Sequence, residues 1–291
     1  MSISMIFRNR KFWPLFWTQF LGALNDNFLK NALVVLITFK EISLLGLNTE
    51  SIVALASAIF ILPFVIFSPI AGQIADKYEK SQLVRYTKLF EVAVMLIAAV
   101  GFFFNLYEVL LFVLFLMGTQ STLFGPVKYS MIPDLVEEEK LVQGNAYVEL
   151  GTFLAILIGT IAGGLVVSLE SATNILCVGL LGLAFVGYLT SRKLPSVPVA
   201  APELNLSYNP LPTISNLWRL LRENVAIFNS VLAISWFWFI GAGVLSLLPA
   251  YCQKYLGAGE HVVTAFLARL QSRCSIAFVT SPRFSSHSST C

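Results

Sequence analysis

Seven apolar runs, each long enough to cross a lipid bilayer as a helix, dominate this sequence. They cover residues 12–39, 52–74, 83–104, 109–127, 141–168, 175–191 and 230–255. Only 12% of the 291 residues are charged, against roughly 25% in an average soluble domain, so the charges are too few for a water-facing surface. We therefore expect an all-α polytopic membrane protein whose surface partners are membrane lipids. The net charge of +3 does not indicate a nucleic-acid partner.

Lysine and arginine residues alternate between the two sides of these runs. One side holds thirteen of them: Arg8, Arg10, Lys11, Lys77, Lys80, Arg85, Lys88, Lys128, Lys140, Arg192, Lys193, Arg219 and Arg222. The other side holds Lys40 and Lys254. The positive-inside rule then predicts a cytoplasmic N-terminus. It also supports the number of spans, since one missed helix would disrupt the alternation.

The order of the spans predicts one six-helix half and the beginning of a second. We expect the first half over residues 1–191, a cytoplasmic linker over 192–229 and the first helix of the second half over 230–268. Apolar residues of the linker recur at helical spacing: Ile214, Leu217, Trp218 and Leu221. This spacing, with arginines on the remaining face, is typical of an amphipathic helix at a membrane surface.

Residues 269–291 do not continue the apolar pattern. They hold three arginines and seven serines where an eighth apolar run would be due. We expect a frameshift or a C-terminal truncation, and a genuine polar tail is the alternative. An apolar span in another reading frame after about Phe266 would decide between them.

The first span is unusually polar. It carries Gln19, Asn25, Asp26, Asn27, Lys30 and Asn31. An ionisable group inside a span costs at least about 2.5 kcal/mol on insertion scales, so such residues indicate function by default. An ion pair between Asp26 and Lys30 that only stabilises the bundle is one interpretation. The additional amides exceed what one pair needs and favour a wet cavity.

Charged pairs and glycines in later spans have structural explanations. Lys88 and Glu91 lie three residues apart, and we expect them to pair while Lys88 snorkels toward the cytoplasm. A direct role of the two residues with substrate is the alternative. Glu149 in the fifth span shares a helix face with Asn145 and Thr152. The Gly159-xxx-Gly163 motif in the same span predicts close helix packing.

The fourth span ends in a segment that could bind phosphate. Gly125-Pro126 is expected to bend or break the helix there. Lys128 would follow at the floor of the cavity, either as a phosphate ligand or as an ordinary positive-inside lysine.

The loop after the second span carries a recognisable motif. It reads Gly72-Gln-Ile-Ala-Asp76-Lys77-Tyr-Glu-Lys80 and resembles the signature loop of the major facilitator superfamily. Glu79 stands where that signature usually has glycine, and Ser81 where a second basic residue is common. The resemblance implies that Gly72, Asp76, Lys77 and Lys80 lock neighbouring helices during alternating access.

Three further segments narrow the resemblance. Residues 25–31, 120–129 and 144–149 look like the lysophospholipid transporter branch of the superfamily, which includes transporter regions fused to acyltransferase and acyl-ACP synthetase domains in Gram-negative bacteria. The resemblance implies inward flipping of lysophosphatidylethanolamine-like lipids across the inner membrane for re-acylation. It also implies that Asp26 and Lys128 contact the head group. The remaining substrate-binding candidates are Asn25, Asn27, Lys30, Gln120 and Glu149.

The same sequence bears on three other functions. A proton-coupled exporter of amphipathic molecules, with Asp26 or Glu149 as the proton carrier, keeps the fold and changes the cargo. A membrane-bound acyltransferase would need an HxxxxD pair, and neither His261 nor His287 has an acid five residues later. A non-functional fragment is the third alternative, because both six-helix halves are needed to close a cavity. We expect no catalytic residue and no cofactor, and the spacing of the four cysteines does not indicate a metal site.

Overall fold

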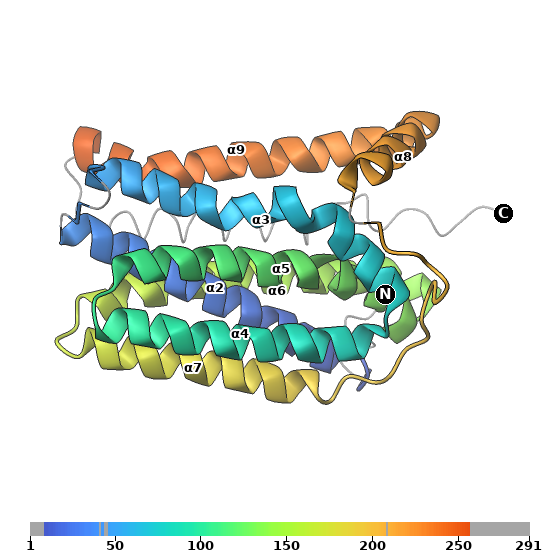
Figure 1. Ribbon diagram of the computed structural model, residues 1–291, viewed down its shortest axis with the longest axis horizontal. Coiled ribbons are helices and arrows are strands. Elements are labelled where there is room, and N and C mark those ends of the chain that lie inside the picture. The colour runs from blue at the N-terminus through green and yellow to red at the C-terminus, as the bar shows by residue number, and fades with distance from the viewer. Residues whose placement is uncertain (1–8, 41, 44–45, 208, 257–291) are drawn as a thin grey trace. The chain divides into compact units, whose positions relative to one another are not determined.

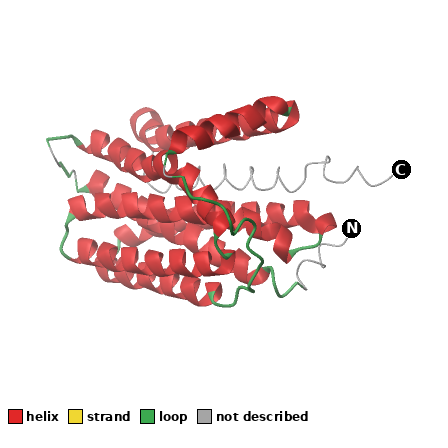
Figure 2. Cartoon of the chain, turned by 45° about the vertical axis from the view of Figure 1, so that its right-hand side comes forward, coloured by secondary structure: helices red, strands yellow, loops and turns green. Residues whose placement is uncertain are grey.

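The computed structural model describes residues 9–256 except 41, 44–45 and 208, and the elements that these residues form are helices (Figures 1 and 2). They are α2 (Trp13–Phe39), α3 (Thr49–Lys77), α4 (Lys80–Phe103), α5 (Tyr107–Leu135), the short 3-10 helix η1 (Glu138–Lys140), α6 (Leu141–Val167), α7 (Ala172–Ser191), α8 (Pro210–Glu223) and α9 (Val225–Leu256). The chain divides into two compact units, Met1–Leu206 and Ser207–Cys291. The expected tail at 269–291 lies outside the described residues.

The helices confirm the all-α polytopic fold. Six of them, α2 to α7, are long and apolar enough to cross a membrane. Residues 213–241 of α8 and α9 form a bent pair with a 114° turn, and the number of candidate spans reaches seven if this pair is taken as one. The unit boundary after Leu206 falls inside the expected linker, while the expected boundaries at 191 and 229 remain predictions.

Polar residues fix several helix ends. The side chain of Asn48 accepts a hydrogen bond of 3.0 Å from the backbone N–H of Ser51 and caps α3. Glu79 caps α4 by accepting hydrogen bonds from the backbone N–H groups of Ser81 and Gln82. Beyond α4 the chain turns at Asn105, whose φ of 54° lies in the left-handed region that asparagine tolerates better than most residues.

The expected helix break at Gly125-Pro126 is wrong. Helix α5 continues through Pro126 and a second proline, Pro133, and ends only at Leu135. A proline removes one backbone hydrogen bond, and α5 keeps its helical conformation while packed against α3 and α4. Lys128 therefore projects from a continuous helix rather than from a loop after it.

Close packing of α2 on α6 forms the centre of the first unit, and α2 also packs on α7. Helix α4 packs on α5 and α7, and α3 packs on α5 (Figure 1). The two glycines of α6 allow the close approach: a Cβ on Gly159 would lie 2.5 Å from the carbonyl oxygen of Leu24, and one on Gly163 would lie 2.5 Å from that of Phe28. The packing role predicted for this motif is confirmed.

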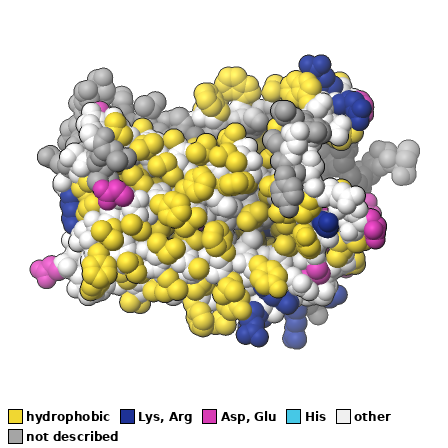
Figure 3. All heavy atoms as spheres, viewed as in Figure 1, with side chains coloured by type: hydrophobic (Ala, Val, Ile, Leu, Met, Phe, Trp, Pro, Cys, Tyr) yellow, Lys and Arg dark blue, Asp and Glu magenta, His cyan; other side chains and the backbone are white. Residues whose placement is uncertain are grey.

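The buried apolar side chains of the first unit form two clusters. One gathers around Leu29, Met95 and Met117, and the other around Leu15 and Phe124. On α2, α4 and α5 the chain passes from one cluster to the other through a short stretch of buried polar residues. On the outside, apolar side chains cover the middle of the face seen in Figure 3, and charged ones lie toward its ends, as a lipid-facing surface requires.

Candidate functional site

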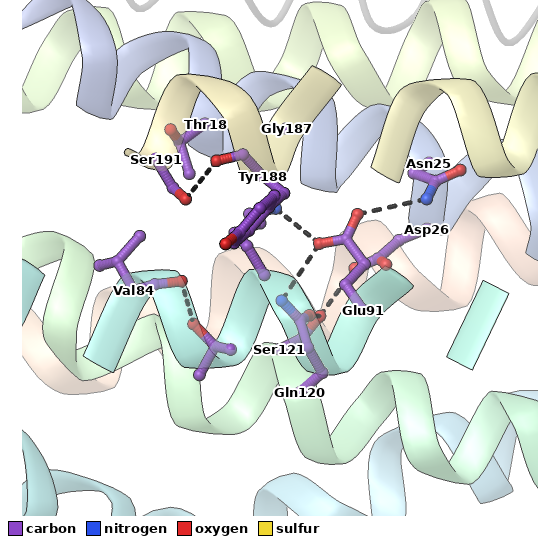
Figure 4. Close-up of polar contacts among 12 residues, drawn as sticks. Thr18, Asn25, Asp26, Val84, Glu91, Gln120, Ser121, Gly187, Tyr188 and Ser191 are labelled. Carbon is purple, nitrogen blue, oxygen red and sulfur yellow. Dashed lines mark hydrogen bonds and ion pairs between the residues drawn. The ribbon is translucent and has the colours of Figure 1, made fainter. Parts of the chain in front are cut away.

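Glu91 of α4 is the centre of a buried polar cluster, shown in Figure 4. Its side chain is 2% exposed. One carboxylate oxygen accepts hydrogen bonds from Lys88 Nζ at 2.6 Å and Gln120 Nε2 at 3.2 Å. The other accepts one of 3.2 Å from Asn25 Nδ2. A single carboxylate thus joins α2, α4 and α5 at the level between the two apolar clusters.

Lys88 does not snorkel, contrary to expectation. Its side chain is 0% exposed, and its ammonium lies 5.2 Å from the centroid of the Phe124 ring. Space for it exists because α2 has a glycine at this level: a Cβ on Gly22 would lie 2.3 Å from Lys88 Nζ. The expected pairing of Lys88 with Glu91 is confirmed, at a depth where a lone charge would be costly.

Asp26 extends the cluster toward α5. One of its carboxylate oxygens accepts a 2.7 Å hydrogen bond from the hydroxyl of Ser121, the neighbour of Gln120. The other oxygen of Asp26 and the side-chain oxygen of Asn25 are buried without a hydrogen-bond partner in the described part of the chain. Buried acceptors are normally satisfied, so two adjacent residues with open acceptors are the feature of this cluster that calls for a ligand.

Asp26 and Lys30 do not form a close ion pair in the described structure, although each lies within electrostatic range of the other. Between described residues, the close ion pairs are Lys80–Asp134, Lys88–Glu91 and Lys140–Glu137. The ammonium of Lys30 instead lies 5.2 Å from the centroid of the Phe60 ring on α3. Although both residues belong to α2, Asp26 therefore contacts α5 and Lys30 contacts α3.

The other polar residues of α2 mainly hold it to its neighbours. Gln19 donates to the carbonyl of Val148 at 3.1 Å, and Asn31 donates to the carbonyl of Thr160 at 2.7 Å, both on α6. Asn27 donates to the carbonyl of Ala23 within α2 itself, at 2.8 Å. The amides of the first span thus divide between helix packing and the Glu91 cluster.

Lys128, Tyr129 and Glu149 form a second group, on α5 and α6. The Tyr129 hydroxyl donates a hydrogen bond to the Glu149 carboxylate, and the Lys128 ammonium lies 4.7 Å from the centroid of the Tyr129 ring. Lys128 is eight residues beyond Gln120 on the same helix, about 12 Å along its axis. It is nevertheless within electrostatic range of both Glu149 and Asp26.

The signature-like segment is distinct from both groups, and it runs from the last turns of α3 through Tyr78 and Glu79 into α4. Lys80 bonds Asp134 at 2.7 Å and the carbonyl of Ser130 at 2.8 Å, which ties the start of α4 to the end of α5. Asp76 is exposed, and its backbone carbonyl accepts from the N–H of Ala201 at 2.9 Å. Lys77 lies over the Tyr78 ring at 5.9 Å, and a Cβ on Gly72 would meet nothing within 4 Å.

A comparison of the sequence with known protein families identifies this architecture. The family profile described as Major Facilitator Superfamily matches residues 15–281. The chain belongs to the Major Facilitator Superfamily. It is therefore a multi-pass membrane protein of a transporter family, and this membership explains why residues 72–80 resemble the superfamily signature.

Two similar members of the superfamily carry the same name. The chain is 25% identical over 251 residues to the lysophospholipid transporter LplT of Enterobacter sp. (strain 638). It is 26% identical over 255 residues to the protein of the same name in Escherichia coli (strain SE11). Each match covers 86% of this chain and 59% of the relative, so the chain spans about three-fifths of the length of these relatives.

The sequence does not predict three residues of the polar cluster as site residues. It favours a local structural pair for Lys88 and Glu91 over a direct role with substrate, and nothing in it singles out Ser121. The available signal was a carboxylate well inside an apolar span, which is costly unless several partners stabilise it. Asn25, Asp26 and Gln120 were found, whereas Lys128 and Glu149 belong to the neighbouring group.

Proposed function

We propose that this protein moves lysophospholipids of the lysophosphatidylethanolamine kind across the bacterial inner membrane by alternating access, with its N-terminus in the cytoplasm. Membership of the superfamily and the name of its relatives support transport of a lipid. The bias of lysine and arginine toward one side of the spans supports the orientation. Acyltransferase and acyl-ACP synthetase activities would consume the lipid on the cytoplasmic side.

The open acceptors of Asn25 and Asp26 carry this proposal. Each has a buried side-chain oxygen without a partner in the described structure. An ethanolamine ammonium is cationic and has three N–H donors, which match a carboxylate and an amide oxygen. Because Glu91 already accepts from Lys88, Asn25 and Gln120, Asp26 is the carboxylate left to meet a cation from outside.

The phosphate of the same head group needs a cation, and Lys128 supplies it in this proposal. Glu149 accepts from Tyr129 and so helps to hold the ring beside which the Lys128 ammonium lies. Asn27 and Lys30 of α2 and Gln120 of α5 would act on the position of the head group. Exposed apolar residues of α3, such as Phe64 and Val65, offer a surface for the acyl chain.

Uptake of labelled lysophosphatidylethanolamine by spheroplasts that express the full chain tests the proposal. Asp26→Asn keeps the size of the side chain and removes its charge, so we expect most of the uptake to be lost at unchanged membrane abundance. Glu139→Gln, which neutralises an exposed carboxylate of η1, is the matched control and should retain uptake.

Wild-type uptake by Asp26→Asn would overturn the assignment of the head-group site. Efflux of an amphipathic dye that lysolipid does not compete for, with no lysolipid uptake, would instead indicate the proton-coupled exporter.

A further inference from the structure

The second unit contains a sharp elbow between α8 and α9. Helix residues 213–223 and 225–241 turn through 114° across Asn224. The side-chain oxygen of Asn224 accepts hydrogen bonds from the backbone N–H groups of Ala226 at 3.1 Å and Ile227 at 3.2 Å. Asn224 therefore caps α9, and this capping sets where one helix stops and the next begins.

The elbow places an amphipathic helix beside a membrane-spanning one. The described part of α9 exposes apolar side chains along its length, among them Val231, Ile234 and Phe239, as a span in contact with lipid does. Because the two axes are close to perpendicular, α8 runs close to the membrane plane when α9 crosses the membrane. Its exposed Ile214, Leu217 and Trp218 recur on one face at helical spacing.

A pocket of about 210 Å³ lies inside the elbow, lined by Trp218, Leu221, Arg222, Val225 and Phe228. The rings of Trp218 and Phe228 stand 6.2 Å apart at 79°, one from each helix, and form apolar walls. The guanidinium of Arg222 lies 5.0 Å from the centroid of the Trp218 ring. Stacking on this ring holds the guanidinium at the pocket while its N–H donors stay available.

The charge of the elbow is complementary to phospholipid head groups. The elbow carries two basic residues, Arg219 and Arg222, and one acidic residue, Glu223. Arginine binds phosphate through two parallel hydrogen bonds, and tryptophan prefers the interface between lipid and water. A pocket with apolar walls, one arginine and direct continuity with a span fits a molecule with a phosphate at one end and hydrocarbon at the other.

We propose that the α8–α9 elbow binds an anionic phospholipid of the leaflet that this end of α9 enters. Arg222 contacts the lipid phosphate, and Trp218 and Phe228 contact the glycerol and the upper acyl chain. This site is separate from the substrate site on α2, α4 and α5, and it would anchor the linker between the two halves to the membrane surface.

Retention of phosphatidylglycerol by the purified full chain tests the proposal. The protein is extracted from nanodiscs of phosphatidylcholine mixed with phosphatidylglycerol, and native mass spectrometry measures the lipid that stays bound. Removing one arginine near an anionic surface costs about fivefold in affinity, and losing a hydrogen bond to a charged group costs roughly a further tenfold. Arg222→Gln should therefore weaken retention by about fiftyfold. Arg219→Gln removes the same charge from the same helix outside the pocket, so it should weaken retention by only about fivefold. Trp218→Leu keeps both charges and should also weaken retention.

Hydrogen–deuterium exchange of residues 213–228 gives a second readout that does not depend on how each variant folds. The wild-type chain should exchange more slowly in nanodiscs that contain phosphatidylglycerol than in pure phosphatidylcholine. Equal retention by the two arginine variants would show a diffuse charge effect and overturn the site. Equal exchange in both kinds of nanodisc would also overturn the proposal. It would mean that another part of the protein covers α8, or that α8 is not covered at all.

Discussion

The carboxylate of Glu79 accepts a 3.0 Å hydrogen bond from the backbone N–H of Val197, 118 positions further along the chain. The same carboxylate caps α4 through the N–H groups of Ser81 and Gln82. Arg85 adds a second bond of 3.0 Å to the carbonyl of Leu194. Glu79 stands where the superfamily signature usually has glycine, and here this residue joins the segment after α7 to the connection between α3 and α4.

Protonation of Glu79 should release this segment. Burial alone would raise the pKa of Glu79, but hydrogen bonds from Val197, Ser81 and Gln82 outweigh burial and hold the pKa below its ordinary value. The stabilisation is therefore complete above the ordinary carboxyl pKa and is lost as the pH falls through the lowered one. A spin label at the exposed Ser196 should become more mobile over that acidic range.

The Glu79→Gln variant removes the titrating group. Its label at position 196 should already be mobile at neutral pH and show no further change on acidification, whereas Glu139→Gln should behave as wild type. A label in Glu79→Gln that stays as immobile as in wild type would show that Leu194 and Val197 hold the segment by packing alone.

Loss of Lys88 should destabilise the bundle strongly. Lys88→Met leaves the Glu91 carboxylate buried without its cation, which costs about 3–5 kcal/mol of unfolding free energy. The double variant Lys88→Met/Glu91→Gln removes the stranded charge and should recover most of the loss. Denaturant titration of the purified protein in micelles measures the unfolding free energy of both variants.

Lys140→Met is the control, in the more exposed pair with Glu137, and should change the unfolding free energy by about 0–1 kcal/mol. A loss at Lys88 no larger than at Lys140 would contradict the buried pair.

Alanine at Gly159 should push α2 away from α6. Its Cβ would lie 2.5 Å from the carbonyl oxygen of Leu24, a backbone atom that cannot rotate aside. We expect a loss of about 1–3 kcal/mol from overpacking, measured as a lower midpoint of thermal unfolding. Gly182→Ala, where a Cβ meets nothing within 4 Å, should be neutral or slightly stabilising. Equal midpoints for the two variants would refute the close contact.

The sequence predicts the spans well because each depends on local composition. Apolar runs and their charged boundaries correspond to α2 to α7, and the Gly159-xxx-Gly163 spacing predicts a contact without naming its partner helix. The helix through Pro126 was not predictable, since neighbouring helices stabilise it against the local effect of proline.

The candidate site was predicted only where polarity was concentrated in one segment. Asn25 and Asp26 stood out within the first span, but Glu91 gained its importance from Asn25 and Gln120 on other helices. The depth of Lys88 likewise depends on Gly22, 66 positions earlier, which leaves room for the ammonium. Such relations arise from packing between helices and have no signature in a single stretch of sequence.

The position of Glu91 between the two apolar clusters has an evolutionary consequence. Its carboxylate accepts from three side chains on three helices, so losing the lysine leaves a charge that the two remaining amides cannot neutralise. Among homologues, positions 88 and 91 should therefore change together, and position 22 should stay glycine only where position 88 keeps its long cation. Relatives that abandon the ion pair are expected to fill this layer with hydrocarbon on all three helices at once.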